Sequence, residues 1–323
     1  MSRHFFMYQT EIGKEILKAK SLLEKGEVVA IPTETVYGLA ANALDVHAVA
    51  KIYEVKNRPQ FNPLIVHVAN KEQLMHFVHE VPEDFLKLMD AFSPGALTYL
   101  LNKSDLIPDI TTAGSNKVAV RIPDHPIALG LLSSLSFPLA APSANLSGYV
   151  SPVSAQHVFE GLSGKIPYIL DGEISKVGIE STIVGIEQGQ TVIHRLGGIS
   201  KDDLEKVLGK SIAVSITHDT PETPGQLKSH YATKKPLVIG DINKLMIEYI
   251  GKKIGILSFK NSFTSEAAQV VLSTRGDVAE AASKLFSAMR YLDQQDIDMI
   301  LAEYVPETGV GMAVNDRLRR AAH

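Results

Sequence analysis

A group of polar side chains near the start of this chain has the composition of a ligand site. Residues 28–31 are apolar, and four polar residues follow within the next six positions. The four are Thr33, Glu34, Thr35 and Tyr37. A buried polar group without a partner costs about 1–3 kcal/mol, so a polar cluster at the end of a buried strand needs something to bind. The segment therefore predicts one wall of a binding site.

Two cationic residues, Lys56 and Arg58, stand two positions apart just before a predicted strand. In an extended segment, residues two apart point to the same side, so both cations would grip one polyphosphate. Arginine matches phosphate oxygens through paired hydrogen bonds, and lysine acts as a compact charge. The alternative is a pair of solvated surface cations. Pro59 and Pro63 restrict the loop and favour a positioning role.

Two more polar residues lie in apolar segments. Arg121 ends the apolar run 118–121, and a guanidinium so close to a buried strand needs an anion. That anion is either Asp124, in an internal ion pair, or a bound ligand. His67 lies inside the apolar run 64–68, where a neutral histidine satisfied by the core is the usual structural explanation.

A turn of small and hydroxyl-bearing residues, 140–148, is a further candidate. Its simple interpretation is an Asx or Ser turn, although small side chains also let a ligand approach the backbone closely. Common nucleotide motifs are absent: the sequence has no G-x-x-x-x-G-K-[ST], and Gly309 and Gly311 lack the third glycine of a dinucleotide fingerprint. A nucleotide site would therefore consist of scattered cationic and hydroxyl groups.

The elements that must position these residues form two units. A predicted helix over 11–26 and several short apolar strands interleave irregularly, which predicts an α/β domain with a large twisted mixed sheet over 10–212. The main predicted strands are 28–31, 64–68, 97–101, 118–121, 168–170, 181–186 and 191–195. Residues 213–236 have the composition of a linker. Regular alternation of strands and helices, one of them near Glu266, then predicts a small Rossmann-like parallel-sheet domain over 237–323.

Composition narrows the class of protein. The chain has 323 residues, 45% of them hydrophobic, a formal net charge of -4 and no cysteine. This composition is typical of a globular protein, excludes disulfides and cysteine-ligated zinc, and argues against a protein that coats nucleic acid by bulk charge. No secretion signal is visible and no apolar run approaches the roughly 18–20 residues of a membrane span, so a cytoplasmic location is expected.

Several segments together resemble the Sua5/YrdC family of threonylcarbamoyl-AMP synthases. The resemblance begins at segment 31–40 and extends in order to Tyr231. Its motifs are K-x-R at 56–58 followed by N-P-L-I-V-H at 62–67, S-A-N at 143–145, E-S-T-I-V at 180–184, R-x-G at 195–197 and P-G-x-x-x-x-H-Y at 224–231. Any one of these matches alone would be weak, whereas the ordered set is specific.

The resemblance implies a nucleotidyltransferase that makes L-threonylcarbamoyl-AMP from L-threonine, bicarbonate and ATP, releasing pyrophosphate. This reaction is the first step of threonylcarbamoyladenosine formation at position 37 of tRNAs that read codons starting with A. Mg²⁺ is the implied companion of the phosphates. The product would pass to a tRNA threonylcarbamoyl-transferase complex, and a weak direct contact with tRNA is left open.

The resemblance also assigns site residues. Catalytic roles fall to Lys56 and Arg58. The implied L-threonine contacts are Thr35, His67, Arg121, Ala141 and Ser181. The implied ATP contacts are Lys56, Arg58, Asn62, Lys117, Ser143, Asn145, Ser151, Arg195 and Tyr231, with Tyr231 and the linker forming a lid. No protein ligand for a metal is assigned, and the roles of Thr33, Glu34 and Tyr37 are open.

Two alternatives remain at this point. One is an RNA-binding module of the same fold without synthase activity, which the lack of a sustained basic stripe disfavours. The other is a carbamoyl-adenylate former that uses carbamoyl phosphate, as in hydrogenase maturation proteins. Those proteins carry zinc-finger modules, for which this chain has no cysteines.

Overall fold

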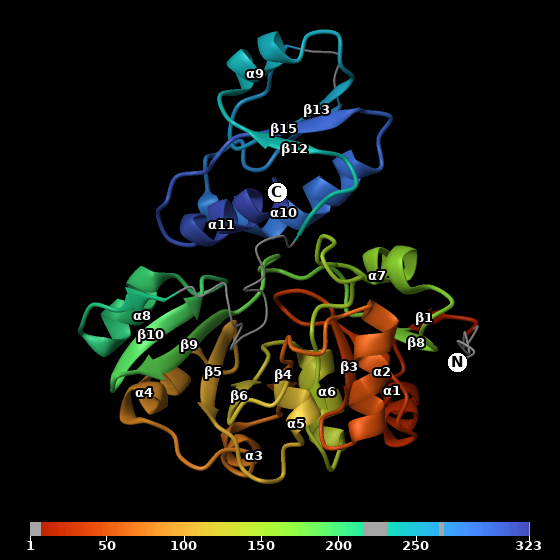
Figure 1. Ribbon diagram of the computed structural model, residues 1–323, viewed down its shortest axis with the longest axis vertical. Helices are drawn as coiled ribbons and strands as arrows, with labels where there is room; N and C mark the ends of the chain where they lie inside the picture. The colour runs from red at the N-terminus through yellow and green to blue at the C-terminus, as the bar shows by residue number, and fades with distance from the viewer. Residues whose placement is uncertain (1–7, 216–230, 265–267, 323) are drawn as a thin grey trace.

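A computed structural model describes residues 8–215, 231–264 and 268–322. Two α/β units lie one above the other (Figure 1). The larger unit, from the N-terminal part of the chain, contains an 11-stranded sheet, and the smaller one contains a four-stranded sheet. The expected motif at 224–231 lies outside the described residues except for Tyr231.

The large sheet is mixed, as predicted. Strand β4 pairs parallel with β6, whereas β5 pairs antiparallel with β6. In sheet order the strands are β1 (Glu11–Gly13), β8 (Tyr168–Leu170), β2 (Val29–Ile31), β3 (Gly38–Asn42), β7 (Leu139–Ala140), β4 (Ile65–His67), β6 (Lys117–Arg121), β5 (Leu97–Asn102), β9 (Thr182–Glu187), β10 (Gln190–Arg195) and β11 (Ala213–Val214).

Helices cover both faces of this sheet because strand residues alternate sides. In β2, Val29 and Ile31 pack in the cluster that holds α1 and α6, whereas Ala30 belongs to the cluster on the other face. The helices of the large unit are α1 (Ile16–Glu24), α2 (Val46–Lys56), α3 (Lys71–Met75), α4 (Glu83–Phe92), α5 (Asp109–Thr112), α6 (Pro126–Ser134), α7 (Ala155–Leu162) and α8 (Lys201–Leu208). Ser200 caps α8 by accepting a hydrogen bond from the Asp203 backbone N–H.

The predicted helix over 11–26 is wrong in its first turn. Residues Glu11–Gly13 form strand β1, which pairs parallel with β8, and the helix begins only at Ile16. Edge pairing there satisfies backbone groups that the helix would otherwise have used. Gly13 lies close to the Tyr168 hydroxyl, so a side chain at that position would clash. The apolar periodicity is present, but sheet pairing overrides it.

The small unit confirms the predicted parallel sheet. Its strands, in sheet order, are β12 (Leu237–Ile239), β15 (Met299–Ala302), β13 (Ile254–Ser258) and β14 (Ala268–Val271). Helix α9 (Ile242–Glu248) covers one face, and α10 (Val278–Asp293) and α11 (Gly311–Ala321) cover the other. The helix expected near Glu266 falls on residues outside the described ranges.

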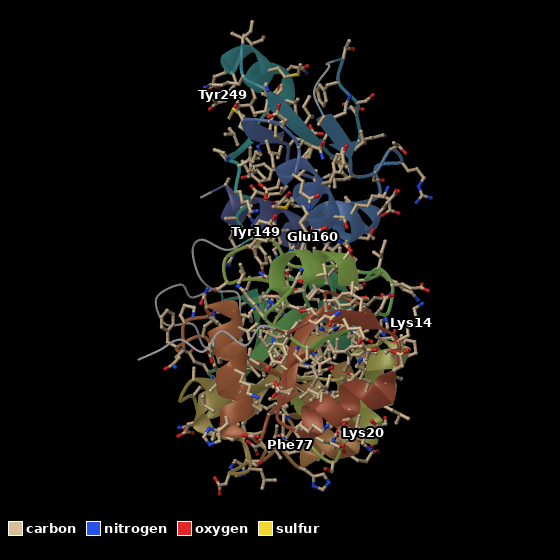
Figure 2. The ribbon with its side chains drawn as sticks, turned by 90° about the vertical axis from the view of Figure 1, so that its right-hand side faces the viewer. Lys14, Lys20, Phe77, Tyr149, Glu160 and Tyr249 are labelled. Carbon is tan, nitrogen blue, oxygen red and sulfur yellow. The ribbon has the colours of Figure 1, made fainter. Side chains whose placement is uncertain are left out.

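Helices α10 and α11 form the side of the small unit that faces the large one (Figure 1). Arg290 of α10 donates to the Val150 carbonyl at 2.5 Å, and the Tyr149 hydroxyl donates to Asp293 at 2.8 Å. Figure 2 shows Tyr149 and Glu160 at this junction. The contacts attach the C-terminal unit to the loop that follows the S-A-N segment. Among the described helices, none has the length and apolar character needed to cross a membrane.

Candidate active site

One cavity gathers most of the residues singled out in the sequence. Its lining includes all five predicted L-threonine contacts and four of the predicted ATP contacts, Arg58, Ser143, Arg195 and Tyr231. The complete lining is Thr33, Thr35, Val36, Gly38, Arg58, Ile65, His67, Arg121, Ala141, Pro142, Ser143, Glu180, Ser181, Arg195 and Tyr231. Segments far apart in sequence therefore meet at a single site.

Sheet register explains why the predicted threonine residues converge. Strands β4 and β6 are parallel neighbours, and His67 stands directly beside Arg121 at their carboxyl ends. Paired residues on parallel neighbours project to the same face. Ala141 adjoins them because its backbone N–H donates to the Ile65 carbonyl at 2.9 Å. The position of the three residues is therefore a property of the sheet.

Arg121 is held by the polar segment at residues 33–37. Its Nη1 donates to Thr35 Oγ1 at 2.8 Å, and its Nε donates to the Gly95 carbonyl at 3.0 Å. The ion-pair partner is Glu34, whose Oε1 lies 2.6 Å from Nη2, although the groups are not aligned as a hydrogen bond. The alternative pairing with Asp124 is therefore not the one adopted. Glu34 compensates the buried charge of Arg121.

His67 is a buried neutral base beside Arg121. Burial, followed by the nearby Arg121 charge, lowers its pKa to about 3. Its Nδ1 has no hydrogen-bond partner among the described residues. A neutral imidazole can act as donor or acceptor toward a ligand. Nδ1 of His67 is therefore not tied up by a well-aligned hydrogen bond, although the backbone at Ile65 and Leu139 also interacts with the ring.

Two guanidinium groups form the cationic side of the cavity. Arg58 donates to the carbonyls of Asn62 and Pro63 at 3.1 and 2.9 Å. Arg195 donates to the Ser181 carbonyl through Nε at 3.0 Å and Nη2 at 2.8 Å. Burial lowers the pKa of each arginine to about 10, so both stay charged at neutral pH. Two positioned, poorly solvated cations would attract a polyanion strongly.

Lys56 and Arg58 do not lie in one extended segment, so the argument from an extended segment is wrong. Lys56 is the last residue of α2, and Asn57 takes a left-handed conformation with φ of 51°. The Lys56 ammonium donates to the carbonyls of Ser143 and Asn145, which ties the S-A-N turn to α2. Burial, followed by the Arg58 charge, lowers the pKa of Lys56 well below its usual value. Its catalytic role stays a prediction.

Four other predicted ATP contacts lie outside the lining. Asn62 is fully buried, and neither polar atom of its side chain has a hydrogen-bond partner among the described residues. The Asn145 amide donates to the carbonyls of Leu146 and Tyr149. Ser151 donates to Glu180 Oε1 at 2.6 Å. Lys117 begins β6, whereas Arg121 at the cavity ends that strand. Their nucleotide contacts stay predictions.

The roles left open in segment 31–40 are now visible. Thr33 Oγ1 donates to the Val36 carbonyl at 2.7 Å and bonds Thr35 Oγ1 at 2.8 Å, so it shapes the loop while lining the cavity. Tyr37 is buried and donates to the Glu173 carbonyl at 2.7 Å, which is a structural contact. Sequence reasoning gave no role to Glu180, although it directly precedes Ser181 in a matched motif and lines the cavity.

Comparisons with known proteins identify the family of this chain. Residues 21–197 match the family model of Sua5, YciO and YrdC proteins, described as telomere recombination. Residues 199–323 match a second model, described as the C-terminal domain of threonylcarbamoyl-AMP synthase. The chain belongs to the Sua5/YrdC family, and the second match places it among the two-domain Sua5-type members.

Named relatives cover nearly the whole chain. The threonylcarbamoyl-AMP synthase of Bacillus subtilis is 43% identical over 321 residues, which cover 95% of this chain and 93% of the relative. The Pyrococcus abyssi protein of the same name is 41% identical, with coverage of 94% and 93%. A crystal structure of P. abyssi Sua5 complexed with L-threonine superposes with a TM-score of 0.91 at 40% identity, covering 97% of each chain.

Proposed function

We propose that this chain joins L-threonine, bicarbonate and ATP into L-threonylcarbamoyl-AMP and releases pyrophosphate. One observation carries the proposal: four buried basic side chains line a single cavity. Arg121 and His67 are proposed to bind the L-threonine carboxylate, and Arg58 and Arg195 the phosphates of ATP. The solved relative with L-threonine and the synthase names of the other relatives support the same activity.

Charge and hydrogen bonding assign L-threonine to the Arg121 side. The substrate carboxylate would bind the Arg121 guanidinium, which already has Thr35 beside it. Ser181 Oγ, bonded to Thr98 Oγ1 at 2.7 Å, offers a hydroxyl for the polar end of the substrate. Neutral His67 places no positive charge beside the substrate amine, which must lose its proton to react.

The reaction needs proximity and charge neutralisation more than a covalent nucleophile. The threonine nitrogen attacks the bicarbonate carbon, and loss of water leaves a carbamate. A carbamate oxygen then attacks the α-phosphorus of ATP, and the bond to the bridging oxygen breaks as pyrophosphate leaves. Arg58 and Arg195 would offset the charge that develops on the phosphates. Holding all three substrates in one cavity supplies most of the rate.

Mg²⁺ would accompany the triphosphate, whose oxygens are ligands that this ion prefers. Among the described residues, no group of three or more histidine, aspartate or glutamate side chains has the geometry to hold a metal. The ion is therefore proposed as part of the bound nucleotide. We further propose a cytoplasmic enzyme whose adenylate passes to a tRNA threonylcarbamoyl-transferase complex.

Product analysis tests the proposal directly. The protein is incubated with ATP, L-threonine, bicarbonate and Mg²⁺, and the adenylate is sought by mass spectrometry. Formation that requires all three substrates is the expected result. Pyrophosphate release without dependence on threonine would overturn the proposal.

The RNA-binding alternative makes a different prediction. Binding of RNA through phosphates weakens steeply with salt, whereas adenylate formation needs no RNA. A filter-binding titration with tRNA between 50 and 200 mM salt, without ATP, separates the two. Tight, salt-sensitive tRNA binding together with no adenylate would favour the alternative.

A further inference from the structure

An arginine of the C-terminal unit reaches the cavity wall of the large unit. Arg317 lies on α11, and its side chain is 0% exposed. Its Nε donates to Glu180 Oε2 at 3.0 Å, and its guanidinium carbon lies 5.3 Å from the centre of the Tyr231 ring. Glu180 and Tyr231 both line the cavity. One side chain of the small unit therefore contacts two walls of the site.

Glu180 is out of place in a site for a polyanion. Its carboxylate is buried, with 6% of the residue exposed. Glu180 is the one acidic residue among the described residues that line the cavity. Ser151 donates to one of its oxygens and Arg317 to the other, and the nearby Arg195 charge also acts on this carboxylate. Without Arg317, this buried carboxylate would face a triphosphate of the same sign with less positive charge to offset it, which is unfavourable.

Tyr231 is the second group that depends on the small unit. Its backbone is left-handed, with φ of 68°, a conformation that costs a tyrosine about 1–2 kcal/mol and persists only when the surroundings hold it. Its ring stacks on Phe286 of α10, with ring centres 5.3 Å apart. Phe286 and Arg317 come from different helices of the small unit. Together they hold the ring against the cavity.

We propose that Arg317 is a positioning residue for the nucleotide. It neutralises Glu180 and holds Tyr231, so the C-terminal unit completes the ATP side of the cavity. The inference rests on the proposed function, because it takes a triphosphate as the ligand of that side. It gives the C-terminal unit a direct role in the site and leaves the L-threonine side to the large unit.

The test compares Arg317→Met with Arg320→Met. Arg320 lies three residues further along α11, is also buried and pairs with Asp316 at 3.0 Å, as Arg317 does through Nη1. Dissociation constants for ATP and for L-threonine are measured separately by calorimetry, together with the KM for ATP. Arg317→Met should weaken ATP about tenfold or more and leave L-threonine within about twofold. Arg320→Met should change both by about threefold or less.

Two further variants separate the effect of charge from an effect on folding. Glu180→Gln/Arg317→Met buries no unpaired charge, so it should recover ATP affinity to within about threefold of wild type. Arg317→Lys, which keeps the charge, should retain ATP affinity within about fivefold even if Arg317→Met fails to fold. Equal ATP affinity in Arg317→Met and Arg320→Met would overturn the inference. So would a double variant and a lysine variant that both lose tenfold or more.

Failure of the inference differs from failure of the proposed function. If the wild-type protein makes no adenylate, the function is wrong, and the ATP-binding comparison still decides the role of Arg317. If the wild-type protein makes adenylate but Arg317→Met binds ATP normally, only the inference is wrong.

Discussion

The two sides of the cavity are built in different ways. On the L-threonine side, Thr35, His67 and Arg121 come from one sheet and its first loop, and hydrogen bonds or strand register hold them. On the ATP side, Arg58 and Arg195 bind backbone carbonyls, and Tyr231 is held by helices of the other unit. The proposed threonine side therefore lies within one domain, whereas the proposed ATP side depends on how two domains meet.

This difference has a functional meaning. A small amino acid with one carboxylate needs a rigid pocket with few groups, which a sheet edge provides. A triphosphate needs several cations from separate elements, and these must be kept apart from one another until the ligand arrives. The carbonyl contacts of Arg58 and Arg195 hold their charges in place at some cost in hydration.

Loss of Arg121 should have the largest effect. Arg121→Ala removes the partner of the substrate carboxylate and leaves Glu34 as an unpaired buried charge, so kcat/KM for L-threonine should fall about 10³-fold. Threonine-dependent pyrophosphate release measures the effect. Arg121→Ala/Glu34→Gln controls for folding, because it removes both charges. Near-wild-type turnover in either variant would contradict the assignment of the threonine side.

Loss of Arg58 should weaken the use of ATP and leave the binding of L-threonine unchanged. Arg58→Ala should lower kcat/KM for ATP about 10²-fold, because one of two buried cations on that wall is gone. The dissociation constant for L-threonine, measured by calorimetry without ATP, should stay within about twofold. If threonine binding weakened as much as ATP binding, the two sides would not be independent.

His67 should make the free energy of unfolding depend on pH. Its pKa is about 3 in the folded protein against about 6.5 in the unfolded chain, so its contribution to stability is fully present above pH 6.5 and is lost as pH falls toward 3. At pH 5 the loss should be about 2 kcal/mol in the free energy of unfolding.

Urea unfolding of the wild type and of His67→Gln at pH 8 and pH 5 measures this loss. The variant, with no titrating group at this position, should lose less stability over the same interval. An equal loss in both proteins would mean that His67 is solvated, and the description of the threonine side as rigid and dry would be wrong.

Lys117 should have the smallest effect. It begins β6, and the cavity lies at the other end of that strand, so Lys117→Ala should change kcat/KM for ATP by about threefold or less. A 100-fold loss would show that the ATP side extends beyond the lining described above. Pyrophosphate release at limiting ATP makes the comparison.

The sequence by itself singled out the polar residues of segment 31–40 and Arg121, because each follows or ends a short apolar run. His67 and Ser181 were assigned through the family motifs, and the cavity brings them together with Thr35 and Arg121. The mixed sheet and the later parallel sheet also followed from the order of apolar runs. Residues at the ends of strands in one sheet can be recognised from the sequence, because the apolar run beside each of them is local.

Only the tertiary structure decided how the ATP side is built. Lys56 and Arg58 do not belong to one extended segment, because α2 ends between them in a left-handed residue. Glu180 finds its counter-charge at Arg317, 137 residues away in sequence. Nothing local distinguishes a buried ion pair of this kind from two ordinary surface charges, because its energy depends on burial that only domain packing creates.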